Sequence, residues 1–466
     1  MPTTGSATGR HGALAVVAIC FGLVVIDGYD LIVFGSLVPS LLEEPGWHLT
    51  PASAGALASA ALIGMLIGTL VSGLLTDRIG RRAVAVASVV WFSAAMALCA
   101  VAPSPELLWL FRFLGGLGLG GLGPTAVALT VEYAPRGRRQ FFNAMMFAGY
   151  PAGGIAAGVL AILLLPQNSW RVMFWIGALP LVLVVPLLLR FLPESAVFLA
   201  SKGRHTEAAR LAGHYGIDLS APVAAEPVAD AAARGRPMRI LFSRGYLTAS
   251  VLFAAGNFFV LLLIFGLSTG LPQTMRQAGY PLSSALAFLL AFNVGGIFGA
   301  LVLSRAADRV GSKPVTSVAL TVAAACVTVL SLRLDVGVML LVVALAGLCA
   351  AGNQALVNGY VATYYPTAAR ASAIGWATGI GRSGAIVGPL VGGWLLSSGL
   401  QVEWTFYAFA GAALAAAGLI AMVPRPPVGA SRPRSISAAD LVESDLSTAT
   451  TTTQRRRPSR LKENQG

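Results

Sequence analysis

The chain has 466 residues, of which 56% are hydrophobic and only 11% charged, whereas a soluble protein carries about 25% charged residues. Its mean hydropathy of +0.76 and its repeated apolar runs of about 20 residues exclude an ordinary soluble enzyme and indicate an all-α polytopic membrane protein. The net charge of +13 is a property shared with nucleic-acid-binding proteins, but the positions of the basic residues indicate a membrane protein instead.

Twelve apolar segments are long enough to span a bilayer as helices. In chain order they lie near residues 13–36, 52–75, 83–102, 107–131, 141–164, 171–192, 246–270, 283–305, 314–333, 336–363, 371–395 and 403–424. The first segment is too long for the core of a signal peptide, so we expect no cleavable one. The four cysteines lie inside these segments without metal-ligand spacing, and the sequence predicts no disulfide, metal site or cofactor.

The basic residues between these segments predict the orientation of the protein. If the N-terminus is cytoplasmic, most of the 32 Lys and Arg residues fall in cytoplasmic segments, whereas Arg171, Arg276 and Arg333 fall in external loops. This distribution follows the positive-inside rule. We therefore expect a multi-pass protein of a bacterial-type inner (plasma) membrane, with both termini in the cytoplasm, lipid around it and no nucleic-acid partner.

The sequence divides into two halves joined by a polar segment. We predict residues 1–192 to form an N-terminal six-helix half and residues 246–424 to form a C-terminal six-helix half. Residues 193–245 are polar and basic and are predicted to form a cytoplasmic linker. Residues 425–466 are rich in Ser, Thr, Pro and Arg and are predicted to be a disordered cytoplasmic tail.

An internal repeat relates the two halves. The sequence Asp-Arg-Ile-Gly at 77–80 matches Asp-Arg-Val-Gly at 308–311, and the same offset aligns Arg139 with Arg370. One constant offset across separated motifs indicates duplicated, pseudo-symmetric halves. Transporters that work by alternating access are built this way, with a central site between their repeats.

Two acids inside the first apolar segment are the strongest functional signal. Asp27 and Asp30 lie three residues apart, so both carboxyl groups fall on one side of a helix. An Asp near the centre of a membrane helix costs about 2.5–3.5 kcal/mol on insertion scales, and such residues mark ion pathways and proton relays. We therefore predict that this pair takes part in proton coupling.

Longer motifs resemble those of a known superfamily. Residues 73–82, Gly-Leu-Leu-Thr-Asp-Arg-Ile-Gly-Arg-Arg, are similar to the signature between helices 2 and 3 of the major facilitator superfamily. Residues 112–118 resemble the arginine and glycine motif of its helix 4, and residues 193–195, Pro-Glu-Ser, resemble the element after its helix 6. The resemblance implies twelve transmembrane helices in two pseudo-symmetric six-helix halves, the major facilitator fold.

Shorter motifs resemble one branch of that superfamily. Residues 27–30, Asp-Gly-Tyr-Asp, are similar to the hallmark of the aromatic acid:proton symporters. Residues 132–135 and 379–384 are similar to the end of helix 4 and to helix 11 of that group. The resemblance implies uptake of a small aromatic acid anion, such as a benzoate or hydroxybenzoate, together with protons.

Proton coupling has further candidate residues. The resemblance implies that helices 1 and 4 are neighbours, and Arg112 lies at a depth similar to that of Asp27 and Asp30, so it is a candidate partner of either acid. The pair is either a static contact that fixes helix packing or a proton site controlled by the arginine. Glu132, at the inner end of helix 4, is a candidate for passing protons inward or for joining a cytoplasmic gate.

The substrate site is expected to include Arg382. This residue lies near the midplane of the eleventh segment, where a guanidinium can hold a carboxylate by two parallel hydrogen bonds. The alternative is an ion pair with an Asp of the other half, which would gate the site. The further substrate candidates, each of which has helix packing as its alternative role, are Tyr29, Asn257, Asn293, Asn353 and Trp376.

The resemblance also implies a cytoplasmic gate. Residues of the motif between helices 2 and 3 are expected to lie in a loop, with Asp77 near the start of helix 11 and the basic residues paired with nearby acids. The candidate gate residues are Asp77, Arg78, Arg81, Arg139, Asp308 and Arg370.

These observations predict a secondary active transporter and not an enzyme. The expected function is a proton-coupled symporter that imports an aromatic carboxylate and works as a monomer. The alternative is a major facilitator transporter of another organic acid, a sugar or an exported toxic compound. A sensor that binds aromatic acids without moving them is a more distant possibility.

Overall fold

The computed structural model describes residues 7–134, 138–215 and 238–425. The predicted tail lies outside this range except for its first residue, as does the middle of the predicted linker. The described helices of the first half and the linker are α1 (Ala7–Leu42), α2 (Pro51–Ile79), α3 (Arg81–Ala100), α4 (Pro105–Leu119), α5 (Leu122–Tyr133), α6 (Arg139–Phe147), α7 (Gly149–Leu164), α8 (Arg171–Ala178), α9 (Pro180–Phe191), α10 (Ala196–Ser201) and α11 (His205–Tyr215).

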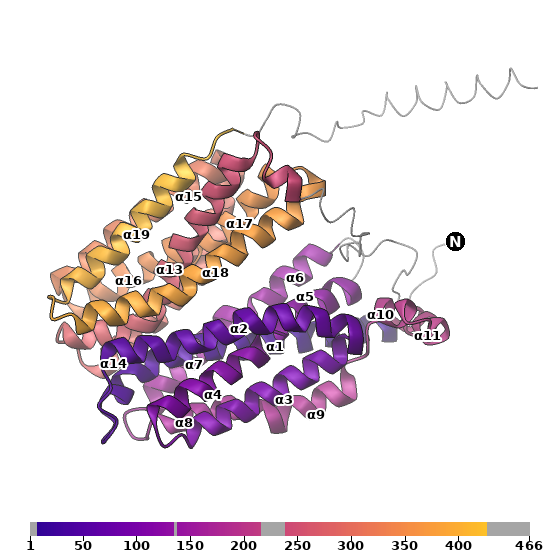
Figure 1. The fold of residues 1–466 in the computed structure, drawn as a ribbon, viewed down its shortest axis with the longest axis horizontal. Coiled ribbons are helices and arrows are strands. Elements are labelled where there is room, and N and C mark those ends of the chain that lie inside the picture. The colour runs from indigo at the N-terminus through magenta and orange to yellow at the C-terminus, as the bar shows by residue number, and fades with distance from the viewer. Residues whose placement is uncertain (1–6, 135–137, 216–237, 426–466) are drawn as a thin grey trace, which may run out of the picture.

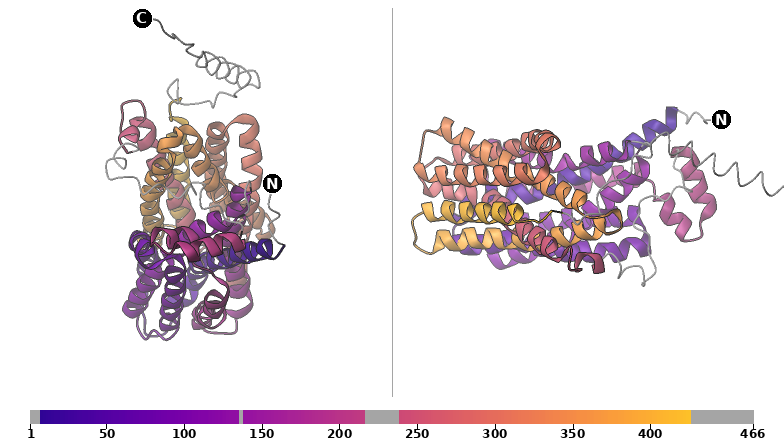
Figure 2. Two further views of the ribbon diagram at one scale, coloured as in Figure 1. Left: turned by 90° about the vertical axis from the view of Figure 1, so that its right-hand side faces the viewer. Right: turned by 90° about the horizontal axis from the view of Figure 1, so that it is seen from above.

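The second half repeats this all-helical arrangement. Its helices are α13 (Leu247–Gln277), α14 (Leu282–Val310), α15 (Ser312–Val329), the short 3-10 helix η1 (Leu330–Leu332), α16 (Val336–Ala350), α17 (Asn353–Tyr364), α18 (Thr367–Ser397) and α19 (Glu403–Ala421). Figure 1 and Figure 2 show the two halves side by side, with α1 to α9 in indigo and magenta and α13 to α19 in red to yellow.

Eleven stretches of the described chain are long and apolar enough to cross a membrane, and their bounds agree closely with the predicted segments. The predicted segment 371–395 is not among them, although α18, which contains it, has 31 residues. Glycines and Arg382 lower the hydropathy of α18. Since this helix packs against α13 and α2, it needs less apolar surface than a helix surrounded by lipid.

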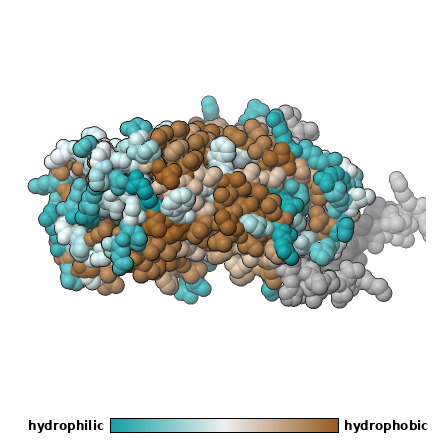
Figure 3. All heavy atoms as spheres, turned by 90° about the horizontal axis from the view of Figure 1, so that it is seen from below, coloured by the Kyte–Doolittle hydropathy of each residue, from teal (hydrophilic) through white to brown (hydrophobic). Residues whose placement is uncertain are grey.

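The outer surface is apolar where lipid is expected. Leu70, Val182 and Leu341 are 69%, 70% and 73% exposed. Figure 3 shows hydrophobic residues across the middle of one face and hydrophilic residues toward its two ends. Such a surface suits a bilayer, whose hydrocarbon core is about 30 Å thick between two polar layers. The chain is thus a multi-pass membrane protein.

The loop expected between the second and third spans is a single glycine. Asp77 and Arg78 lie in the last turn of α2, and Arg81 begins α3, so only Gly80 separates the two helices. Gly80 has a φ of 98°, and its counterpart Gly311 has a φ of 100°. Because side chains disfavour positive φ, glycine permits this sharp connection in both halves. The equal geometry is independent support for the repeat.

The two halves meet closely at the end of the bundle that holds the α1–α2 connection, which is predicted to be the outer end. A Cβ on Gly55 would lie 2.4 Å from the carbonyl oxygen of Pro389, and one on Gly393 would lie 2.3 Å from that of Pro51. The backbone N–H of Ala52 donates to Ser397 Oγ over 2.8 Å. The outer end is therefore closed by backbone contact between α2 and α18.

An ion pair also crosses the outer end. Arg276 Nη1, at the end of α13, donates to Glu43 Oε1, just after α1, over 2.6 Å. At the opposite end Asp77, Asp308 and Arg370 are exposed, and none of the three forms an ion pair with another described residue. The structure thus holds the halves together at the outer end, while the side chain of the candidate gate residue Arg139 lies outside the described residues and the gate stays a prediction.

We expect Gly393→Ala to reduce transport strongly without unfolding the protein. The added methyl group would overlap the backbone of Pro51, and overpacking costs about 1–3 kcal/mol. The outer-closed conformation would then lose about 5-fold to 150-fold in population. The measurement is uptake by the variant in liposomes, with its folded yield checked by gel filtration in detergent.

The matched control is Gly411→Ala on α19, where no described atom lies within 4 Å of the new Cβ. This variant should transport like the wild type. Normal uptake by Gly393→Ala would show that the α2–α18 contact is not needed in the cycle.

Candidate functional site

The two acids of α1 are both buried, but they face different helices. Asp27 is 0% exposed and Asp30 is 1% exposed. Arg112 of α4 donates through Nη1 to Asp30 Oδ1 and forms a buried ion pair with it. The guanidinium carbon of Arg112 also lies 4.8 Å from the ring centre of Phe34. Of the two partners that the sequence left open for Arg112, the structure selects Asp30.

Asp27 instead binds a tyrosine of the same half. The hydroxyl of Tyr150, on α7, donates to Asp27 Oδ2. The other oxygen, Oδ1, is buried and has no hydrogen-bond partner in the described chain. Close packing of α1 on α7 creates this contact, because a Cβ on Gly28 would lie 2.2 Å from the carbonyl oxygen of Tyr150.

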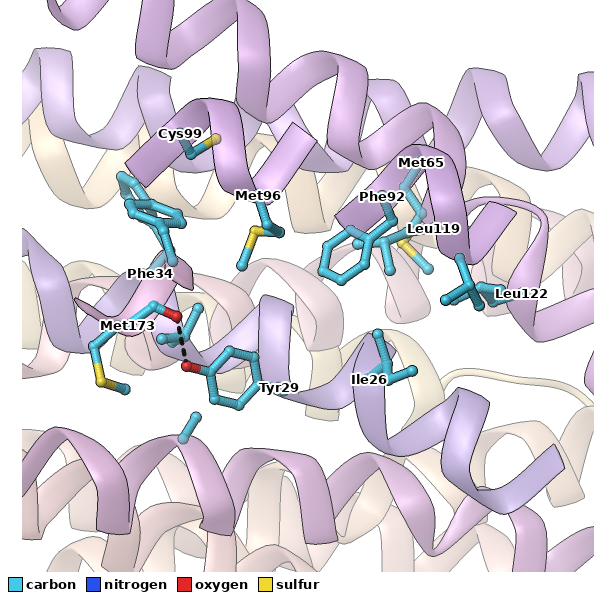
Figure 4. Packing of buried hydrophobic residues seen from close by; sticks show 14 of the residues in the cluster. Ile26, Tyr29, Phe34, Met65, Phe92, Met96, Cys99, Leu119, Leu122 and Met173 are labelled. Carbon is cyan, nitrogen blue, oxygen red and sulfur yellow. Dashed lines mark hydrogen bonds between the residues drawn. The ribbon is translucent and has the colours of Figure 1, made fainter. Parts of the chain in front are cut away.

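Tyr29 lies between the acids in sequence but points elsewhere. Its hydroxyl donates to the carbonyl oxygen of Met173, on α8, over 2.8 Å. Figure 4 shows this bond within a cluster of buried hydrophobic side chains that includes Phe34 and Met96. The contact anchors α1 to α8 inside the first half, while a role of Tyr29 in substrate binding stays a prediction.

Arg382 reaches from α18 toward the first half. Its Nη1 donates to Thr69 Oγ1, on α2, over 2.8 Å. No carboxylate of the described residues forms an ion pair with it. The alternative of a direct ion pair with an Asp of the other half is thus not the arrangement in this conformation.

Chemically, Arg382 retains donors for a ligand. A guanidinium has five N–H donors, and it binds a carboxylate best by two parallel bonds. Only the bond to Thr69 is formed within the described chain. The arrangement therefore holds a cation of the second half against α2 of the first half, with donors left for a ligand.

Two of the predicted substrate residues join helices within the second half. Asn257 is fully buried, donates to the carbonyl oxygen of Ala377 over 2.9 Å, and accepts from Gln354 Nε2 over 3.0 Å. Asn353 is also fully buried and donates to the carbonyl oxygen of Thr316 over 3.1 Å. These contacts match the helix-packing alternative, because the amides link α13 to α17 and α18, and α15 to α17.

The other two predicted substrate residues of the second half make different kinds of contact. Trp376 Nε1 donates to the carbonyl oxygen of Ser250 over 3.2 Å and so ties α18 to α13. Asn293 donates to the carbonyl oxygen of Leu289 on its own helix. Its Oδ1 lies 3.2 Å from the position of a Cβ on Gly154, so Asn293 sits where α14 meets α7 of the first half.

The candidate gate residue Arg81 belongs to a network inside the first half. Its Nη1 donates to Glu132 Oε2 over 2.6 Å, and the same oxygen accepts from Ser195 Oγ over 2.7 Å. The backbone N–H of Arg81 donates to Glu194 Oε1 over 2.8 Å. Glu132 thus joins the start of α3 to the segment after α9, at the end of the half opposite Glu43.

Sequence reasoning missed Tyr150, Thr69 and the outer ion pair. Tyr150 is one of many aromatic residues in the spans, and Thr69 is one small hydroxyl residue among several. The available signal for Tyr150 was its place beside glycines that permit close helix packing, Gly149 and Gly153. The two glycines do not indicate which neighbouring helix Tyr150 contacts.

Comparisons with known proteins identify the family of the chain. A family model described as Major Facilitator Superfamily matches residues 20–332 and 256–461. The benzoate transport protein of Acinetobacter baylyi is 34% identical over 405 residues, which cover 84% of this chain and 85% of that protein. The gentisate transporter of Corynebacterium glutamicum is 36% identical over 415 residues, covering 88% of each chain.

Two further similarities concern a third aromatic acid transporter and the fold. The 4-hydroxybenzoate transporter PcaK of Pseudomonas putida is 34% identical over 418 residues, covering 87% of this chain and 91% of that one. The inward-open structure of the xylose transporter XylE from E. coli superposes with a TM-score of 0.68 at 15% identity, covering 92% of this chain and 99% of that chain. The chain therefore belongs to the major facilitator superfamily of transporters and is related to those named for benzoate, gentisate and 4-hydroxybenzoate.

Proposed function

We propose that the protein is a proton-coupled symporter that imports an aromatic carboxylate of the benzoate or hydroxybenzoate type across the inner membrane by alternating access. The observation that carries this proposal is that Arg382 of the second half bonds to Thr69 of the first half, the half that also contains the buried acid Asp27. Arg382 supplies a cation for the substrate and Asp27 a site for a proton.

The chemistry of the substrate supports the role of Arg382. Benzoate, gentisate and 4-hydroxybenzoate, after which relatives are named, share one carboxylate on an aromatic ring. A guanidinium recognises the carboxylate by charge and by its planar pair of donors. The carboxylate is therefore the group common to all three compounds that a single arginine can bind.

The contacts between the halves support alternating access. The outer end is closed here by the α2–α18 contact and by the Arg276–Glu43 ion pair. In the cycle, binding of substrate at Arg382 and of a proton at an acid of α1 favours this closure, and both cargoes leave to the cytoplasm. In the opposite conformation the outer contacts separate and the candidate residues Asp77, Arg78, Asp308 and Arg370 close the cytoplasmic end.

Transport in liposomes tests the proposal. The purified protein is reconstituted with an inward proton gradient and given labelled benzoate, 4-hydroxybenzoate, protocatechuate or gentisate. We expect protein-dependent accumulation of at least one compound, abolished by a protonophore because the gradient is the energy source. Protein-free liposomes correct for passive entry of the neutral acids.

Two results would contradict the proposal. Uptake that only equilibrates the compound, with or without a protonophore, would show a carrier that is not coupled to protons. Absence of transport for all four compounds, with transport of labelled xylose or an aliphatic acid, would show that the substrate is of another class.

A further inference from the structure

The surroundings of Asp30 disfavour any change in the charge of its carboxyl group. It forms an ion pair with Arg112, and both residues are buried, with 1% and 4% exposure. Removing one charge from such a pair leaves the other buried and unpaired, which is strongly destabilising. The stacking of Arg112 on Phe34 adds a second contact that keeps the arginine in place. The pair therefore suits a fixed link between α1 and α4.

The surroundings of Asp27 allow its carboxyl group to change between the charged and the neutral form. Its Oδ2 accepts from the hydroxyl of Tyr150, and its Oδ1 has no partner among the described residues. A buried carboxylate with a single hydrogen bond lacks most of the stabilisation that water would give it, whereas a neutral carboxyl group tolerates such a site. Oδ1 is the atom on which a proton would sit.

The charged and titratable groups around Asp27 come from three helices. Asp30 lies on the same helix, Tyr150 lies on α7, and Arg382 reaches from α18. Arg382 is the group of these that the second half contributes, and a bound substrate carboxylate would neutralise it. Loss of a nearby positive charge favours the neutral form of a carboxyl group such as Asp27. Substrate binding and proton binding would then favour one another.

We propose that Asp27 is the acid that takes up and releases the transported proton, that Tyr150 is its positioning residue, and that Asp30 remains the fixed counter-ion of Arg112. This inference rests on the proton symport proposed above. The proton passes from water outside to Asp27 Oδ1 and from there to water inside, while the Tyr150 hydroxyl keeps its own proton and holds Oδ2.

The first test separates proton coupling from substrate movement in Asp27→Asn. Counterflow, the exchange of labelled substrate outside for unlabelled substrate inside, needs no net proton movement. Because Asn resembles the neutral acid, we expect the variant to perform counterflow but to lose accumulation driven by the proton gradient. Gradient-driven accumulation at the wild-type level by Asp27→Asn would overturn the inference.

The second test removes the ion pair without leaving a buried charge. We expect the double variant Asp30→Asn with Arg112→Gln to retain accumulation that a protonophore abolishes, because its proton site is intact. Counterflow without accumulation in this double variant, together with accumulation by Asp27→Asn, would assign the proton to Asp30 instead.

Tyr150→Phe tests the positioning role. Loss of the hydroxyl removes a hydrogen bond that favours the charged carboxylate. We expect the pH profile of accumulation to move by about one unit to higher pH, while counterflow at a fixed pH persists. The matched control is Tyr407→Phe on α19, a residue that is 42% exposed and distant in sequence from the site. Identical pH profiles for Tyr150→Phe and the wild type would exclude Tyr150 as a positioning residue.

The wild type distinguishes failure of this inference from failure of symport itself. If the wild type performs counterflow but shows no protonophore-sensitive accumulation, proton coupling and the assignment of Asp27 fall together. If the wild type accumulates substrate and Asp27→Asn does so equally, symport stands and the assignment of Asp27 alone is wrong.

Discussion

Replacing Arg382 by alanine is expected to weaken binding of the aromatic acid by about 10-fold to 150-fold. The guanidinium is the proposed anchor of the substrate carboxylate, and a hydrogen bond to a charged group contributes about 1.5–3 kcal/mol, where 1.4 kcal/mol corresponds to tenfold. The measurement is the dissociation constant of benzoate or 4-hydroxybenzoate for the purified protein in detergent, by titration calorimetry.

Two companion variants define the cause of the loss. Arg382→Lys keeps the charge but removes the planar pair of donors, so its affinity should lie between those of the wild type and the alanine variant. Arg333→Ala removes an arginine that pairs with Glu403 over 3.0 Å and is largely exposed, and it should bind normally. Unaltered affinity in Arg382→Ala would remove Arg382 from the substrate site and leave a gating role through Thr69.

Replacing Arg112 by alanine is expected to destabilise the protein by about 3–5 kcal/mol, because Asp30 would remain buried without its partner. The folded yield should fall steeply. Unfolding of a large membrane protein is often irreversible, so stability is measured as the rate of thermal inactivation in detergent.

The double variant Arg112→Leu with Asp30→Leu removes both charges and should recover most of the stability that Arg112→Ala loses. Replacing both partners of a buried ion pair by apolar residues is often neutral or stabilising. The comparison variant is Arg204→Ala, which breaks the exposed pair with Glu207 and should leave the inactivation rate close to that of the wild type, because exposed ion pairs contribute little to stability. Normal stability of Arg112→Ala would mean that water or another group compensates the charge of Asp30.

The amino-acid sequence predicted the architecture well because the bilayer imposes simple rules. A helix must present about 20 apolar residues to cross the hydrocarbon core, so the spans and most of their ends could be placed from hydropathy. The exception, α18, contains glycines and Arg382 because it lies between other helices. The repeat of residues 77–80 at 308–311 identified the two halves, and Gly80 and Gly311 share the same positive φ.

Only the tertiary structure could assign a partner to each acid. Three residues turn a helix by about 300° and advance it by about 4.5 Å, so Asp27 and Asp30 share one side of α1 but point about 60° apart. Asp30 therefore meets Arg112 on α4, and Asp27 meets Tyr150 on α7. The sequence contains the spacing but does not state which neighbour lies on each side.

The sequence also could not determine which partners the Asn side chains inside the spans bond to. An Asn inside a span satisfies its polar atoms either with a ligand or with a neighbouring helix. Asn257 and Asn353 bond to other helices of the second half, and Asn293 lies against the first half. Whether an Asn side chain meets a ligand or a neighbouring helix depends on the rotation of each helix about its axis. That rotation is set by packing across the whole bundle.

By itself, then, the sequence determined that this chain crosses the membrane as two related helical halves, and it singled out Asp27, Asp30, Arg112 and Arg382 as ionisable residues inside the spans. Those properties depend on composition and on spacing along one chain. The tertiary structure decided that Arg112 pairs with Asp30 and that Arg382 bonds to Thr69 of the other half. These contacts join residues far apart in sequence, so they depend on how whole helices pack.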